Sequence, residues 1–129
     1  MTEGRQIKFD IGKEGLETVL LSWQVELMRW IWGVDGDVDS RAAYIYLRGS
    51  STPMSRAAAI NFLNEMAYGG FLAYREVTTK GGRKRLYRPS PEAPDEETFG
   101  RALAGRIIDK ARTELARAAQ PCPDLRVKK

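Results

Sequence analysis

The basic side chains of this sequence gather between residues 49 and 90, and their spacing suits phosphate binding. This segment holds seven lysines and arginines against two glutamates, a net charge of +5, whereas the whole chain carries +4. Four of them surround a glycine pair: Lys80, Arg83, Lys84 and Arg85. So concentrated a positive patch is typical of a surface that binds nucleic acid. The alternative is a solvated hairpin whose charges only protect a strand edge from aggregation.

The stretch before these basic residues, SRAAAINFLNEM, contains side chains that could read bases from a helix. Arginine pairs with guanine, asparagine with adenine, and small apolar groups with thymine methyls, whereas hydroxyls donate to phosphates. Besides the four basic residues, the predicted DNA contacts are therefore Thr52, Ser55, Arg56, Ala57, Ile60, Asn61 and Asn64.

The composition argues against catalysis and against a metal site. The chain has no histidine, the usual general base, and its single cysteine, Cys122, cannot form an internal disulfide. Asp35, Asp37 and Asp39 alternate as in calcium loops, but the glycine and the final glutamate of such a loop are missing. Turn and capping roles suit these aspartates better. We expect no enzymatic activity, no cofactor and no bound metal.

The length of 129 residues is that of one ordinary domain. The sequence has no run of eighteen apolar residues, and its first residues lack the apolar stretch of a signal peptide. We therefore expect a cytoplasmic protein that does not enter a membrane.

The elements that position these side chains are predicted from periodicity and from capping and turn residues. Alternation near the start predicts an extended arm or strand within residues 1–12, and a short helical turn follows in 13–20. Ser22 is expected to cap a first helix, whose apolar face holds Val25, Met28, Ile31 and Trp32. Residues 34–39 are predicted to form a loop, and Asp39 or Ser40 is predicted to cap a second helix over 41–47.

Ser55 is predicted to cap a third helix, whose core face holds Ala59, Phe62, Leu63 and Met66. Strands then follow over 71–79 and 83–88, joined by a two-residue turn at Gly81 and Gly82. That turn would place Val77 opposite Leu86, and Glu76 opposite Tyr87. Three helices followed by a hairpin predict a mainly α fold with a small β-hairpin, a winged helix-turn-helix domain over residues 1–90.

A last helix is predicted from about residue 95 to 119, within a C-terminal segment of residues 91–120. Its apolar stripe needs a partner surface, either the flank of the domain or a second copy of the chain. The predicted dimerisation residues are Phe99, Leu103, Ile107, Ala111 and Leu115. The tail, residues 121–129, is expected to be disordered.

Three stretches carry a resemblance to a known family: KFDIGKEGLETVL with VELMRWIW, SRAAAINFLNEMAYGGFL, and KGGRKRLYRP. In order and spacing they resemble the winged helix regulators of the penicillinase and methicillin repressor group, and more loosely the multiple-antibiotic-resistance regulators. The resemblance implies a homodimeric repressor that binds a palindromic operator. The positions that match its recognition helix and wing are Ser55, Arg56, Ala57, Ala58, Ile60, Asn61, Lys80, Arg83, Lys84 and Arg85.

The end of the chain departs from that family, since only one long helix follows the wing, and this puts induction by proteolysis in doubt. The expected partners are double-stranded DNA and a second copy of the chain. A small-molecule effector could bind between the last helix and the first, which holds Trp23, Trp30 and Trp32, but such tryptophans more often belong only to the core. Two other functions stay open: a winged helix that binds another protein, and a nucleic-acid or chromosome-architecture protein without sequence preference.

Overall fold

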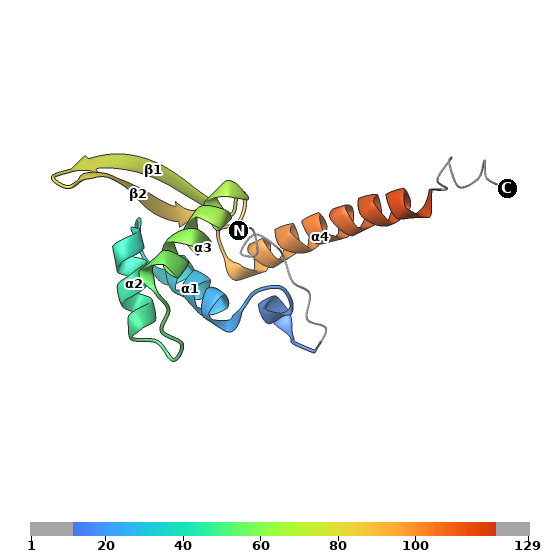
Figure 1. The fold of residues 1–129 in the computed structure, drawn as a ribbon, viewed down its shortest axis with the longest axis horizontal. Helices are drawn as coiled ribbons and strands as arrows, with labels where there is room; N and C mark the ends of the chain where they lie inside the picture. The colour runs from blue at the N-terminus through green and yellow to red at the C-terminus, as the bar shows by residue number, and fades with distance from the viewer. Residues whose placement is uncertain (1–11, 121–129) are drawn as a thin grey trace.

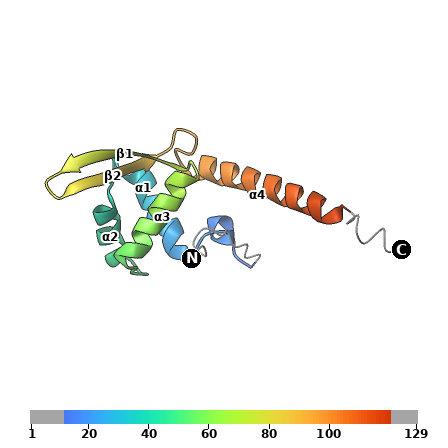
Figure 2. The same cartoon turned by 45° about the horizontal axis from the view of Figure 1, so that its top comes forward.

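The computed structural model describes residues 12–120, so the predicted arm within residues 1–12 and the tail from 121 lie almost entirely outside the described residues. Three helices precede an antiparallel hairpin, and a long helix extends away from them (Figures 1 and 2). The elements are the 3-10 helix η2 (Gly15–Thr18), α1 (Ser22–Gly33), α2 (Ser40–Arg48), α3 (Arg56–Tyr68), β1 (Leu72–Thr79), β2 (Gly82–Pro89) and α4 (Glu96–Ala119). This order confirms the predicted winged helix-turn-helix fold with a C-terminal helix.

Side-chain caps fix the start of three helices. The side-chain oxygens of Asp39, Ser55 and Asp95 accept bonds from backbone N–H groups three residues later, at 2.8, 3.1 and 2.8 Å. These bonds satisfy amides that have no partner inside the helix. The predicted cap at Ser22 is wrong, because Ser22 is already the first residue of α1. The residue before it, Leu21, donates its backbone N–H to the side-chain oxygen of Gln24 at 2.9 Å.

The main core lies where α1, α2 and α3 meet the base of the hairpin. Three helices and both strands contribute buried side chains to it: Trp23, Leu27, Met28, Ile31, Val38, Ala43, Leu47, Ala59, Phe62, Leu63, Leu72 and Tyr87. The predicted apolar faces of α1 and α3 are confirmed, although Trp32 and Met66 are only partly buried. Burying each large aliphatic or aromatic side chain contributes about 1.5–3 kcal/mol, which fixes how the three helices pack.

The hairpin register differs from the predicted one by two residues. Val77 pairs with Lys84 and Glu76 with Arg85, because the turn occupies Lys80 and Gly81. Gly82 already pairs with Thr79, and it has a positive φ of 117° that glycine adopts without strain. Since side chains alternate with a period of two, this shift changes their cross-strand partners but not the face on which each lies.

The segment predicted as a loop before α2 contributes a short β-bridge to the hairpin. The backbone N–H of Val38 donates to the carbonyl of Tyr87 at 2.8 Å, and the Tyr87 N–H donates back at 2.7 Å. The hairpin is thereby attached to the helical part of the domain through the residue just before the cap of α2.

The first turns of α4 pack against the domain, whereas the rest of this helix projects from it (Figure 1). Phe99 and Leu103 are 0% and 4% exposed and lie in a second core cluster with Phe71 and Ala93. Farther along, Ile108 and Leu115 are 53% and 68% exposed. The predicted dimerisation stripe is therefore divided between the core of this chain and an exposed face of α4. None of the helices in residues 12–120 is long and apolar enough to cross a membrane.

Candidate nucleic-acid interface

The α2–α3 turn and the start of α3 present the predicted base-reading and phosphate-binding side chains to solvent. Thr52, Ser55, Arg56, Ala57 and Asn61 are exposed. Their exposure follows from the burial of the opposite helix face, which packs into the main core. Within the turn, the Ser50 hydroxyl donates to the Leu47 carbonyl at 2.7 Å and accepts from the Thr52 N–H at 3.2 Å. These bonds hold the turn that precedes α3, while Ile60, one turn into the helix, is only partly buried.

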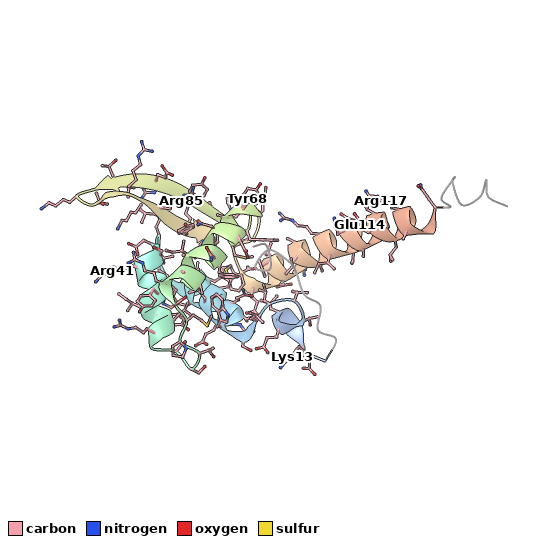
Figure 3. All side chains as sticks on the ribbon, viewed as in Figure 1. Lys13, Arg41, Tyr68, Arg85, Glu114 and Arg117 are labelled. Carbon is pink, nitrogen blue, oxygen red and sulfur yellow. The ribbon has the colours of Figure 1, made fainter. Side chains whose placement is uncertain are left out.

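Asn64 joins this helix face to the hairpin. Its amide oxygen accepts from the Arg85 guanidinium at 3.1 Å and from the Tyr87 hydroxyl at 2.6 Å. The Arg85 guanidinium also lies over the Tyr74 ring, 4.4 Å from its centroid. Figure 3 shows Arg85 on the hairpin above α3. The oxygen of Asn64 is therefore engaged inside the protein, which differs from the free amide that base reading requires.

Tyr87 stays a neutral donor in this arrangement. Burial raises the pKa of the Tyr87 hydroxyl above its ordinary value, although the neighbouring Arg85 acts in the opposite direction. A hydroxyl that keeps its proton donates to Asn64 across the neutral pH range. The link between α3 and β2 is thus independent of pH under ordinary conditions.

Four of the seven cations between residues 49 and 90 form ion pairs with acids of the same chain. Arg83 and Arg85 approach Glu76 at 3.3 and 3.6 Å. Arg75 and Lys84 lie 3.1 and 2.9 Å from the carboxylates of two residues in the α1–α2 connection, Asp37 and Asp39 respectively. Within residues 12–120, no salt bridge joins Arg56, Lys80 or Arg88 to an acid.

Sequence reasoning missed the three acids that neutralise part of the hairpin. For Glu76, the signal was present but the predicted register gave it the wrong cross-strand partner. For Asp37 and Asp39, the sequence predicted turn and capping roles, and capping is confirmed for Asp39. Their ion pairs span 38 and 45 residues, so no local pattern could indicate them.

Asp39 is held in its charged form by two donors. Burial acts to raise the pKa of its carboxyl, but bonds from the Ala42 N–H and from the Lys84 ammonium outweigh that effect and lower the pKa. A charged Asp39 can serve the helix and the hairpin together, because one oxygen accepts from Ala42 and the other from Lys84.

A further basic residue lies near this surface. Arg41 is exposed and projects outward from the first turn of α2, below the hairpin in Figure 3. The preceding cap residue, Asp39, bonds to Lys84, so this turn lies next to β2. Arg41 is therefore an additional candidate for phosphate contact that the sequence did not single out.

The tryptophans predicted to border an effector site are packed against other rings. Trp23 meets Phe62 edge-on, Trp30 stacks on Tyr46, and Trp32 contacts Phe99 with centroids 5.4 Å apart. An apolar groove of about 640 Å³ lies instead between η2 and α4, lined mainly by Leu16, Val19, Leu103, Ala104, Ile107 and Ile108. Among the described residues, no group of three acidic or cysteine side chains could hold a metal ion.

No family model matches this sequence, and no curated protein matches it. Among solved structures, the chain is similar to a "possible transcriptional regulator" from Methanosarcina mazei Go1. The TM-score is 0.54 and the identity 13%, over 78% of this chain and 81% of that one. At this identity the likeness concerns the fold, and it supports the winged helix assignment.

Two PadR family transcriptional regulators are also similar in structure at low identity. The protein from Eggerthella lenta DSM 2243 has a TM-score of 0.48 and 12% identity, over 73% of this chain and 80% of that one. The protein from Clostridium difficile R20291 has a TM-score of 0.48 and 15% identity, over 74% and 99%. The predicted membership of the penicillinase and methicillin repressor group is not shown by these similarities.

Proposed function

We propose that this protein is a sequence-specific transcriptional regulator that binds double-stranded DNA. In this proposal α3 enters the major groove and the β1–β2 hairpin acts as a wing on the backbone or in the minor groove. The observation that carries it is the bond of Asn64 to Arg85, 3.1 Å long. Because Asn61 lies one helical turn before Asn64 on the same face of α3, this bond places the basic hairpin beside the helix face that carries Asn61.

The proposed roles on this surface differ between the helix and the wing. Arg56 and Asn61 are exposed and can pair with guanine or adenine edges, and Ala57 and Ile60 can contact thymine methyls. Thr52 and Ser55 donate to phosphates, and so does Lys80 at the tip of the wing, which forms no salt bridge within residues 12–120. In this proposal the protein acts in the cytoplasm, where it would meet its operator. It acts as a repressor, which blocks the operator when it binds.

Selection of bound sequences from a random duplex library tests this function. We expect a defined motif, and we expect Arg56→Ala with Asn61→Ala to abolish the preference for it. Each lost bidentate contact removes about 1–3 kcal/mol of discrimination, or roughly five- to 150-fold. Weak binding to every sequence should persist through the wing.

The control for this experiment is Tyr68→Ala, at the far end of α3, which should keep the selected motif. Equal affinity for all duplexes in the wild-type protein would favour the nucleic-acid protein without sequence preference. Absence of binding to any duplex at moderate salt would favour the protein-interaction module.

We also propose that two copies associate through the uncovered face of α4. Ile108, Ala111 and Leu115 lie on one helical face, and the groove between η2 and α4 begins beside Ile108. Exposed apolar side chains on a helix that projects from its domain are typical of a protein–protein contact. Since Phe99 and Leu103 belong to the protomer's own core, the dimer contact falls on the outer half of the predicted stripe.

Light scattering tests the dimer. Leu115→Glu should yield monomers, because a charge would be placed in the apolar contact. Thr113→Glu adds the same charge at an exposed position on another face of α4 and should leave the dimer intact. A dimer that persists in the Leu115 variant would exclude this face, and a palindrome in the selected sequences would independently support twofold symmetry.

A further inference from the structure

Two aspartates of the α1–α2 connection flank the residue that bonds to the hairpin. Val38 forms the backbone bridge to Tyr87 on β2. On one side of it, Asp37 pairs with Arg75 of β1 at 3.1 Å, and on the other Asp39 pairs with Lys84 of β2 at 2.9 Å. Three consecutive residues therefore contact both strands of the hairpin, one through its backbone and two through carboxylates. We call residues 37–39 the aspartate clamp.

The burial of the paired side chains indicates whether Arg75 and Lys84 could leave the two aspartates and bind DNA instead. The side chains of Asp37 and Asp39 are 18% and 20% exposed, whereas those of Arg75 and Lys84 are 60% and 44% exposed. If Arg75 or Lys84 turned to a phosphate, a largely buried carboxylate would lose its cation next to a polyanion. Leaving a partly desolvated charge without its partner is unfavourable. The two cations are thus better retained by the clamp than released to DNA.

We infer that Asp37 and Asp39 hold the wing in position through Arg75 and Lys84, so that these two cations set its position instead of binding phosphate. The inference rests on the proposed function only where it concerns DNA. Phosphate contact is left to cations without a salt bridge among the described residues, such as Lys80 at the tip. Lys84 is thereby a positioning residue, which differs from the phosphate contact expected from the sequence.

Amide hydrogen exchange of the free protein tests the clamp without DNA. In Asp37→Asn and in Asp39→Asn, the amides of Val38 and Tyr87 should exchange roughly two- to fivefold faster, the change expected for loss of one surface ion pair. Asparagine is as good a helix cap as aspartate, so Asp39→Asn removes the ion pair and keeps the cap.

Asp35→Asn is the matched control for these two variants. It makes the same charge change in the same connection, at an exposed residue that forms no salt bridge within residues 12–120, and it should leave the exchange of both amides unchanged. Unchanged exchange in the Asp37 and Asp39 variants as well would overturn the clamp.

The salt dependence of duplex binding tests the role of Lys84. Asp39→Asn combined with Lys84→Gln removes the ion pair without changing net charge. If Lys84 only positions the wing, the slope of log affinity against log salt stays at the wild-type value while affinity falls. Lys80→Gln should reduce the magnitude of the slope by about 0.9, the value for one lost phosphate contact.

A slope in the double variant that falls as much as in the Lys80 variant would show that Lys84 binds phosphate and would overturn the inference. If the wild-type protein binds no duplex, the proposed function fails, and the exchange experiment alone decides whether the clamp exists.

Discussion

Asn64→Ala should destabilise the protein well beyond the ordinary effect of a surface substitution. The substitution removes the oxygen that accepts from the buried Tyr87 hydroxyl at 2.6 Å and from Arg85 at 3.1 Å. Arg85 keeps Glu76 and the Tyr74 ring, whereas Tyr87 loses the side-chain partner of its hydroxyl. A buried hydroxyl left without a partner costs about 1–3 kcal/mol. For a domain of this size, each 1 kcal/mol lowers Tm by roughly 4 °C.

A double-mutant cycle measured by urea unfolding isolates this link. Tyr87→Phe alone should cost about 0.5–1.5 kcal/mol, and the double variant with Asn64→Ala should be more stable than the sum of both losses predicts. Asn61→Ala, the same change at an exposed position of α3, should stay within about 0.5 kcal/mol of wild type. If Asn64→Ala costs no more than Asn61→Ala, the bond between α3 and the wing does not stabilise the fold.

Three further outcomes are expected. Leu103→Ala should lower the unfolding free energy by about 2–5 kcal/mol because Leu103 is buried. Leu115→Ala should change the unfolding free energy of the monomer by less than about 0.5 kcal/mol, because Leu115 is exposed. Equal losses for the two variants in denaturant unfolding would contradict the division of α4 into a buried and an exposed part. Arg106→Ala should lower the unfolding free energy by roughly 0.5–1 kcal/mol, because the guanidinium donates to the Gly69 carbonyl at the end of α3 and covers the Phe71 ring. The readout is faster amide hydrogen exchange at that end of α3. The folded-state pKa of Asp39 lies below its ordinary value of 3.8. The difference in unfolding free energy between wild type and Asp39→Asn should therefore be complete above pH 3.8 and disappear as the pH falls below it. A difference that persists in acid would refute the charge of Asp39 as its cause.

Much of the fold follows from signals confined to a few neighbouring residues. The caps at Asp39, Ser55 and Asp95 satisfy amides three residues away, and the apolar faces of α1 and α3 recur at the helical period. Glycine at the hairpin turn is likewise a local requirement. The order of helices and strands was therefore predictable from the sequence, and so was the helix face that carries Arg56 and Asn61.

The register of the hairpin was not decided by such local signals. Both glycines of the pair suit a tight turn, so the sequence allowed a turn at Gly81 and Gly82. In the folded protein Gly82 belongs to β2, and the Thr79 hydroxyl donates to its carbonyl at 2.9 Å. Packing of Leu72 and Tyr87 into the main core, together with the bridge from Val38, fixes the pairing.

The residues along the chain are enough to predict a helix with polar side chains followed by a basic hairpin. Which of those polar and basic side chains remain free of partners within the protein depends on contacts between residues far apart in the chain. Asn64 and Arg85 are 21 residues apart, and Lys84 lies 45 residues from Asp39, yet each pair is in contact. The physical reason is that a charge or an amide has no preferred partner along the chain; its partner is whichever group the packing of the core brings within hydrogen-bond distance.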